Sequence, residues 1–237
     1  MDLLFQLIQD TYISATVLLM VALGGLFAER SGVTNIALEG IMLIGGFAGI
    51  GVLHLIETPD ANPQMLYLIA MTVGAVVGGL YAMIHAYASI QLKANQIISA
   101  TALNLFAPAF AVFVSRILQN GGSQIQFETR FRILEIPFLS DIPIIGPLLF
   151  ERVFISFYLV IGLFFLSKYI MDKTKFGLRI RAMGENPQAA DSLGINIYKY
   201  RFIAVTISGM LAGMGGVIFV ATTSTEYAAT VAGFGFL

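Results

Sequence analysis

The sequence predicts an all-α protein, a polytopic transmembrane bundle of about six helices, and the first observation behind this prediction is its composition. Charged residues make up only 11 % of the 237 residues, whereas 57 % are hydrophobic, and the mean hydropathy is +0.84. Soluble globular chains carry about 25 % charged residues. So few charges could not cover a folded body of this size in water, so lipid is the solvent for most of this chain.

The second observation is the uneven spacing of the charges, which locates the helices. A bilayer core of about 30 Å takes roughly 20 helical residues, so a long apolar run with few charges predicts a membrane span. Six complete spans are expected, at 10–28, 36–56, 65–90, 94–118, 152–171 and 202–221. The N-terminal residues lack the basic region of a signal peptide, so we expect them to be retained as part of the first helix.

Lysine and arginine predict the orientation, because short cytoplasmic loops are enriched in both. The segment 172–201 contains six of them, so we expect it to be a cytoplasmic loop. Counting back through the spans places the N-terminus and the long connection 119–151 outside. Residues 1–237 are therefore expected to form one transmembrane domain with one large loop on each side.

The outer loop has a pattern of its own. Apolar residues alternate with polar ones over much of Gln124–Ile136, and Pro137, Pro143 and Pro147 follow. This pattern predicts a small β-hairpin or an extended segment on the outer face. Two interpretations remain open: a simple connector between helices, or a docking surface for an extracellular partner.

Glycine pairs recur inside the spans with the spacing G-x-x-x-G. They are Gly45 with Gly49, Gly74 with Gly78, and Gly209 with Gly213. In lipid there is no hydrophobic force between helices, so close backbone approach through small residues supplies much of the packing energy. These glycines are expected to pack helices together and carry no information about a substrate.

The loop 172–201 encodes a short helix. Asn186 is a favoured N-cap, Pro187 suits the first helical position, and Gly194 suits a left-handed stop. So short a helix is marginal alone in water, and Ala189 with Ala190 would give it a small face for contact with another surface. It is either a self-capped loop or the contact through which a soluble motor transmits force to the membrane helices.

Polar residues inside or beside the apolar spans are candidates for a substrate pathway, because each is costly in lipid unless it has a partner or faces water. They are Asn35, Glu39, Ser99, Thr101 and Asn104. Each has a structural alternative. Glu39 would also be stabilised by the dipole at the start of its helix, and the polar stripe predicted for Ser99, Thr101 and Asn104 could serve helix–helix hydrogen bonding.

Several functions are excluded by what the sequence lacks. A net charge of −1 does not fit a nucleic-acid partner. No G-x-x-x-x-G-K-[ST] or H-E-x-x-H motif occurs, and the two histidines, His54 and His85, lack neighbours at metal-ligand spacing. No catalytic constellation stands out, so we expect neither an enzyme nor a cofactor or metal bound by this chain.

Four segments in a fixed order carry a resemblance to a known family. They are Glu29–Gly40 (ERSGVTNIALEG), Asn95–Asn104 (NQIISATALN), Phe176–Gly194 and Ser208–Gly216 (SGMLAGMGG). On these segments the chain resembles the permease subunits of ABC importers for branched-chain amino acids, ribose and nucleosides. It most resembles the nucleoside (guanosine-type) permeases, which have a similar ERSGVxNIxLEG after the first span, and the resemblance covers essentially the whole chain.

The resemblance implies a multi-pass transport subunit in a bacterial plasma membrane. It implies pairing with a second permease subunit, a cytoplasmic ABC ATPase that binds ATP and Mg, and an extracellular substrate-binding lipoprotein. It also implies that the ATPase contacts the chain at Gly184, Glu185, Asn186, Pro187, Ala189, Ala190 and Gly194. Family members continue beyond the motif at 232–235, so we expect this chain to be a C-terminally truncated part of a longer subunit.

Nucleosides are the expected substrate, and sugars or branched-chain amino acids are the alternatives within the same family. An ion-coupled secondary transporter is a weaker alternative, because such proteins use intramembrane charged pairs or broken helices in repeated halves. Within the predicted spans, Glu39 is the one buried carboxylate and Pro108 the one interior proline.

Overall fold

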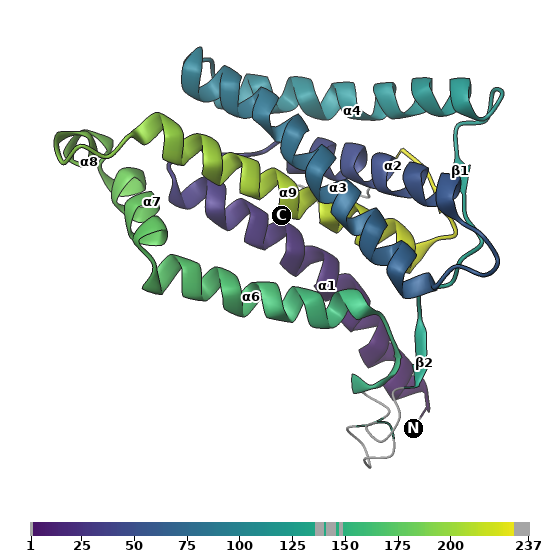
Figure 1. Cartoon of the computed structure of the whole chain (residues 1–237). Helices are drawn as coiled ribbons and strands as arrows, with labels where there is room; N and C mark the ends of the chain where they lie inside the picture. Colours follow the sequence, from purple (N-terminus) through teal and green to yellow (C-terminus); the bar gives the residue numbers. More distant parts are fainter. Residues whose placement is uncertain (1, 136–139, 141–145, 147–148, 230–237) are drawn as a thin grey trace.

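A computed structural model describes residues 2–135, 140, 146 and 149–229 (Figure 1). It contains six helices that are long and apolar enough to cross a membrane, which confirms the predicted bundle. They are α1 (Asp2–Arg30), α2 (Leu38–Ile56), α3 (Pro63–Ala86), α4 (Gln96–Leu118), α6 (Ile155–Lys173) and α9 (Ile197–Thr223). The shorter elements are the π-helical turn η1 (Tyr87–Gln91), α7 (Lys175–Glu185), α8 (Pro187–Ser192), β1 (Ile125–Gln126), β2 (Ile133–Glu135), β3 (Glu151–Val153) and β4 (Glu226–Tyr227).

Side-chain caps set where several of these helices begin. The Oδ1 atoms of Asn62, Asn95 and Asn196 each accept a hydrogen bond from a backbone N–H in the first turn of α3, α4 and α9. An N-cap oxygen satisfies a donor that the helix itself leaves unpaired. For this reason α9 begins at Ile197, five residues before the predicted span, and takes Lys199 and Arg201 into its first turns.

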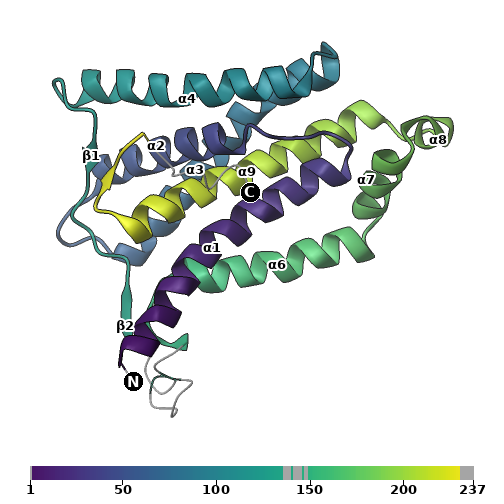
Figure 2. The ribbon, with the colours of Figure 1, turned by 180° about the vertical axis from the view of Figure 1, so that it is seen from behind.

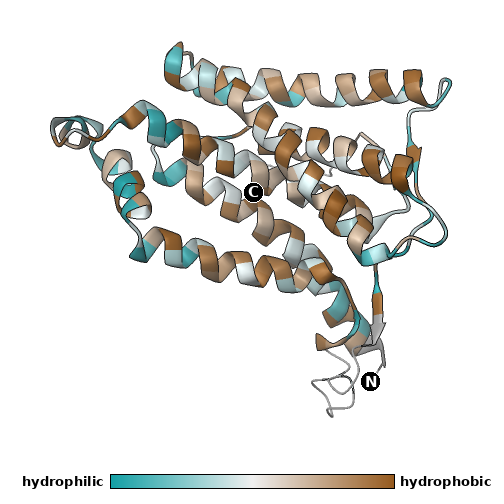
Figure 3. Cartoon of the chain, viewed as in Figure 1, coloured by the Kyte–Doolittle hydropathy of each residue, from teal (hydrophilic) through white to brown (hydrophobic). Residues whose placement is uncertain are grey.

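Helix α9 lies at the centre of the bundle. It packs against α1, α2 and α3, while α4 lies outside α2 and α6 lies outside α1 (Figures 1 and 2). Apolar side chains dominate the long helices, and polar ones gather at the loops and helix ends (Figure 3). The outer helices α4 and α6 leave most of their apolar surface exposed, a surface that suits lipid or other membrane subunits.

The predicted glycine pairs form one three-helix contact, which confirms their packing role. A Cβ atom added to Gly78 would lie 2.6 Å from Gly209 O, and one added to Gly74 would lie 2.9 Å from Gly213 O. Gly45 of α2 approaches the Cα of the same Gly213. The backbones of α2, α3 and α9 thus meet around Gly213 with no room for a side chain.

The described part of the predicted segment Gln124–Ile136 contains two short strands, β1 and β2, which pair with other strands and not with each other. Strand β1 is antiparallel to β4, and β2 is antiparallel to β3. The predicted start of the span at 152–171 is wrong, because α6 begins at Ile155. Residues 152 and 153 belong to β3, and Arg152 has a positive φ of 52°, which is not helical. Pro137, Pro143, Pro147 and residues 230–237 lie outside the described residues.

Strand β4 is anchored to the bundle through Tyr227. Its side chain is fully buried, and its hydroxyl donates to Leu43 O of α2 at 3.1 Å. Burial raises the pKa of the Tyr227 phenol, so the group remains a neutral donor. The anchored strand in turn holds β1, which joins the outer loop to α2.

Charge divides the molecule into two ends. Nine of the thirteen basic residues lie in three segments: the turn after α1, the turn before α4, and the stretch from the end of α6 to the start of α9. They are Arg30, Lys93, Lys168, Lys173, Lys175, Arg179, Arg181, Lys199 and Arg201. Hydrogen bonds and backbone contacts bring these three segments together. We call this end of the bundle, with residues 30–37, 92–95 and 172–201, the basic end.

Replacing Gly213 by alanine should destabilise the bundle, because the added methyl group would collide with Gly74 O of α3. Overpacking of a close contact costs about 1–3 kcal/mol. Thermal unfolding of the detergent-solubilised protein measures the effect. The matched control is Gly162→Ala in α6, where no atom lies within 4 Å of the new Cβ and where alanine favours the helix; equal loss of stability in both variants would contradict the packing role.

Candidate coupling site at the basic end

Helix α8 has the caps that its sequence predicts at both ends. Asn186 Oδ1 accepts a hydrogen bond from Ala189 N at 3.0 Å, and Pro187 occupies the first helical position. Gly194 has a φ of +76°, and Ile195 N donates to Ala190 O while Gly194 N donates to Asp191 O. This pair of bonds is the Schellman motif, which requires a left-handed residue at this position. Six residues are therefore held as a defined helix.

One face of α8 contacts the chain itself and the other is exposed. Ala190 is only 2 % exposed, so it packs against the protein, although the sequence suggested that it would contact a partner. Ala189 is exposed, and Leu193 beside it is 80 % exposed. Ala189 and Leu193 together leave an apolar surface on α8 that is available for contact with another protein.

Helix α7, which precedes α8, is absent from the sequence prediction. Its signal is nevertheless readable: Phe176, Ile180 and Met183 have the i, i+4, i+7 spacing of an amphipathic helix, and Ile180 and Met183 are fully buried. Arg179 Nη1 donates to Tyr200 Oη of α9, and the guanidinium lies over the Tyr200 ring. Helix α7 is thus held firmly against the start of α9.

The end of α7 meets the turn that connects α1 with α2. A Cβ atom on Gly184 would collide with Arg30 O, so the two backbones are in direct contact there. Arg201 Nε of α9 donates to Ser31 O of the same turn at 3.0 Å. We call residues 31–37 the α1–α2 turn; the end of α7 packs beside its first residues.

Hydrogen bonds from three other helices converge on the α1–α2 turn. Thr34 N donates to Gln96 Oε1 of α4 at 2.8 Å, and Asn35 Nδ2 donates to Ser208 Oγ of α9 at 3.0 Å. The Oδ1 atom of Asn35 is buried and has no hydrogen-bond partner among the described residues. The turn is therefore tied to the first residues of α4 and the middle of α9.

His85 makes the connection to α3. The side chain is fully buried; Nε2 lies 3.3 Å from Thr34 O and Nδ1 lies 3.2 Å from Ser99 Oγ. A carbonyl oxygen can only accept, so in the neutral ring Nε2 donates to Thr34 and Nδ1 accepts from the Ser99 hydroxyl. Ser99, which is predicted to line a substrate pathway, orients the His85 ring.

Asn104 supplies a cap to a helix other than its own. Its Oδ1 accepts from Gly40 N at 2.8 Å, and its Nδ2 donates to Ile36 O at 2.9 Å. Ala37, the residue at the N-cap position of α2, makes no side-chain cap. Asn104 of α4 therefore satisfies a first-turn donor that α2 leaves unpaired, which favours the helix–helix interpretation of this residue over a pathway role.

The three residues of the predicted polar stripe on α4 do not share one face. Thr101 is exposed, and its hydroxyl donates to Ile97 O of its own helix at 2.8 Å. Thr101 and Asn104 are three positions apart and are neighbours on the helix surface, whereas Ser99 and Thr101 are two positions apart and point in different directions. Glu39 lies half-buried in the first turn of α2, where the helix dipole favours a carboxylate.

The sequence predicts roles for Asn35, Ser99 and Asn104 but not for the other residues of this network. It assigns no role to Gln96, which binds Thr34, or to Ser208, which binds Asn35, and it considers His85 only as a metal ligand. A signal existed, since Gln96 and Ser208 lie within two of the segments that carry the family resemblance. Their partners could not be read, because each lies more than 50 positions away in the chain.

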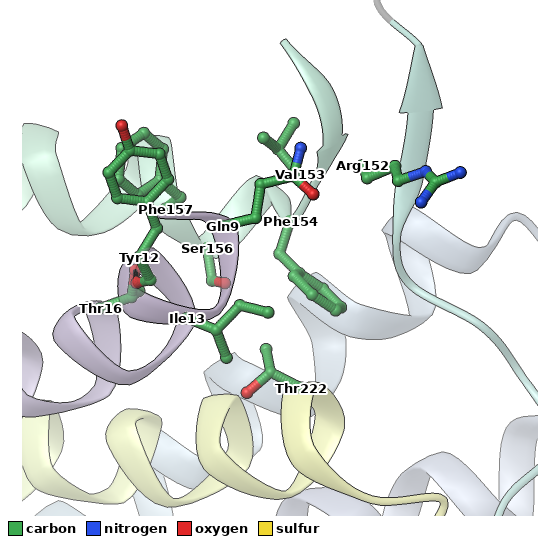
Figure 4. A pocket seen from close by; sticks show the side chains of 10 residues that line it. All are labelled: Gln9, Tyr12, Ile13, Thr16, Arg152, Val153, Phe154, Ser156, Phe157 and Thr222. Carbon is green, nitrogen blue, oxygen red and sulfur yellow. Dashed lines mark hydrogen bonds between the residues drawn. The ribbon is translucent and has the colours of Figure 1, made fainter. Parts of the chain in front are cut away.

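Two pockets lie toward the other end of the bundle. A pocket between α1, α6 and α9 is lined by Ile13, Thr16, Ser156 and Thr222, among others (Figure 4), and holds about 20 Å³, which is room for about one water molecule.

A second, polar cavity of about 900 Å³ opens on the outer loop. There the Glu57 carboxylate accepts from Glu128 N and from the backbone and hydroxyl of Thr129, which fixes the rim.

Comparison with known proteins decides the family. Residues 7–237 match the branched-chain amino acid transport system permease component. The chain belongs to this family. It is a permease and a multi-pass membrane protein, in agreement with its six apolar helices.

Individual relatives are similar over nearly the whole permease. It is 40 % identical to the nucleoside ABC transporter permease protein NupC of Lactococcus lactis and 40 % identical to the guanosine ABC transporter permease protein NupQ of Bacillus subtilis. Each alignment covers 98 % of this chain and 72 % of the relative. A glucose ABC transporter permease protein of Haloferax volcanii is 24 % identical, over 96 % of this chain and 60 % of the relative. No solved structure matches.

Replacing Asn104 by leucine should destabilise the permease, because Gly40 N and Ile36 O lose their partner while the volume of the side chain is kept. Leaving such groups unpaired costs about 1–3 kcal/mol. The Thr101→Val control removes a hydroxyl that bonds only its own helix, and should change stability by less than about 0.5 kcal/mol. Thermal unfolding measures both variants, and faster hydrogen exchange at Gly40 N identifies the lost cap; an unchanged exchange rate would contradict it.

Proposed function

We propose that this permease forms the membrane pathway of an ATP-driven importer for nucleosides. The observation that carries the proposal is the 40 % identity, over 98 % of the chain, to two permeases named for nucleoside and guanosine transport. A nucleoside is uncharged and presents hydroxyls, donors and acceptors. Neutral amides and hydroxyls, the polar groups found inside these spans, suit such a substrate better than fixed charges.

The importer requires partners. The proposed assembly lies in a bacterial plasma membrane and contains a second permease subunit, a cytoplasmic ATPase that binds ATP and Mg, and an extracellular substrate-binding protein. The arrangement of the cavities supports the second subunit: the pocket between α1, α6 and α9 holds only about 20 Å³, and the cavities of about 900 Å³ and 250 Å³ lie at the two ends of the bundle. The pathway then runs along a face of this chain and is completed by its partner.

The basic end is the cytoplasmic end in this proposal, and α8 contacts the ATPase. Leu193 and Ala189 form the exposed surface of α8, and the caps Asn186 and Gly194 keep it rigid enough to transmit force. Gly184 and Glu185 end α7 beside it. A displacement of α8 carries α7 with it and presses on Arg30 at the end of α1 and on Gly32 of the α1–α2 turn.

The α1–α2 turn distributes that displacement. It begins α2, bonds to His85 of α3, to Gln96 and Asn104 of α4, and to Ser208 of α9. These bonds join the turn to α3, α4 and α9, and the turn itself connects α1 with α2, so its movement reaches five of the six spans at once. In this mechanism Asn35, Ser99 and Asn104 affect the pathway by fixing how the helices lie relative to one another. They need no contact with the substrate.

Replacing Leu193 by glutamate should weaken association with the ATPase, because a charge replaces the most exposed apolar side chain of the α7–α8 segment while no internal contact is lost. We expect at least a tenfold loss of co-purified ATPase. The control is Leu55→Glu at the opposite end of α2, where the side chain is also 80 % exposed. Thermal unfolding checks that both variants fold, and normal ATPase recovery with folded Leu193→Glu would rule out α8 as the contact.

Uptake by the reconstituted importer tests the substrate. With ATPase, second permease and binding protein present, we expect ATP-dependent uptake of guanosine that excess adenosine or uridine reduces and that glucose or leucine does not. ATP-dependent uptake of glucose or leucine, with no uptake of nucleosides, would support the sugar or branched-chain amino acid alternative that the family description and the glucose permease favour. Uptake driven by an ion gradient without ATP would contradict the importer.

A further inference from the structure

A cavity of about 250 Å³ at the basic end lies apart from α8 and from the α1–α2 turn. It is lined by the C-terminal parts of α1 and α6 and by α7, which lies between the diverging ends of these two helices (Figures 1 and 2). One side of it is apolar and is lined by Leu23 and Leu26 of α1 with Phe164 and Met171 of α6. Its position is at the level where the apolar spans give way to charged residues.

The other side of the cavity carries three cations, one from each helix. They are Arg30 at the end of α1, Lys168 in the last turns of α6, and Arg181 of α7. Among the described residues that line it, Asp172 is the one carboxylate. The local formal charge is therefore positive, in a chain whose net charge is −1.

Arg181 identifies the missing interaction. Its Nε atom is buried and has no hydrogen-bond partner among the described residues. A buried guanidinium donor without a partner is costly. An anionic oxygen in the cavity would satisfy it and would balance the three cations at the same time.

We propose that this cavity binds the phosphate of an anionic phospholipid from the cytoplasmic leaflet, with Arg30, Lys168 and Arg181 around the phosphate and an acyl chain along the apolar side. Basic pockets between transmembrane helices on the cytoplasmic side are known to hold such head groups. The exposed fraction of Phe164, 39 %, leaves the apolar side open toward lipid. An uncharged nucleoside would not offset the positive charge, so the site is separate from the transport pathway.

Native mass spectrometry of the purified permease tests the proposal. After incubation with phosphatidylglycerol, we expect one tightly retained lipid, and at least tenfold less retention of phosphatidylcholine, which carries the same phosphate without net charge. Inorganic phosphate at the same concentration should not displace the lipid, because it lacks the acyl chain. Each cation near an anionic membrane surface changes binding by about fivefold, so the triple variant R30Q/K168Q/R181Q should retain at least tenfold less phosphatidylglycerol.

The matched control is K173Q/K175Q/K199Q, which removes the same charge from exposed positions of the basic end that do not line the cavity. It should keep the lipid. Equal loss in both triple variants would show diffuse attraction rather than a site, and equal retention of phosphatidylcholine would show an apolar groove only; either result overturns the proposal. Should the triple variant not fold, Arg181→Gln alone should reduce retention at least threefold, and no reduction would overturn it too.

Discussion

The contact around Gly213 is the constraint on which the rest of the structure depends. Lipid tails are as apolar as leucine, so helices in a membrane gain little by burying apolar surface and must gain by approaching closely. Gly45, Gly74 and Gly78 allow α2 and α3 to touch α9 backbone to backbone. Helix α1 packs on the same α9, and α4 and α6 are added outside, with broad apolar faces left for lipid or partner subunits.

Polar side chains in this bundle mainly satisfy backbone groups. Asn104 caps α2 from α4, and His85 binds the α1–α2 turn from α3. In the bilayer core no water is available to bond an unpaired backbone N–H or C=O group. The bonds from these side chains therefore hold the α1–α2 turn in one position. The end of α7 meets the same turn, so in the proposed mechanism one set of contacts serves both stability and force transmission.

The two ends of the bundle differ in chemistry. The basic end carries most of the lysine and arginine, the capped α8 and the cavity between α1, α6 and α7. At the outer end, short strands, Tyr227 and the Glu57 carboxylate hold the long loop around a wide polar cavity. A transporter that receives substrate on one side and force on the other needs this separation, because each end then presents its own partner surface.

The sequence by itself determined what depends on neighbours along the chain: the six apolar spans, the glycine pairs, and both caps of α8, since helix length, G-x-x-x-G spacing and capping are local properties. Helix α7 was also readable from its periodicity but was overlooked among its charges. Only the tertiary structure decided that β1 pairs with β4, that Ala190 faces inward and that Asn104 caps Gly40, 64 residues away. Such pairings depend on which helices lie side by side, and that choice is made by packing between segments that no local pattern relates.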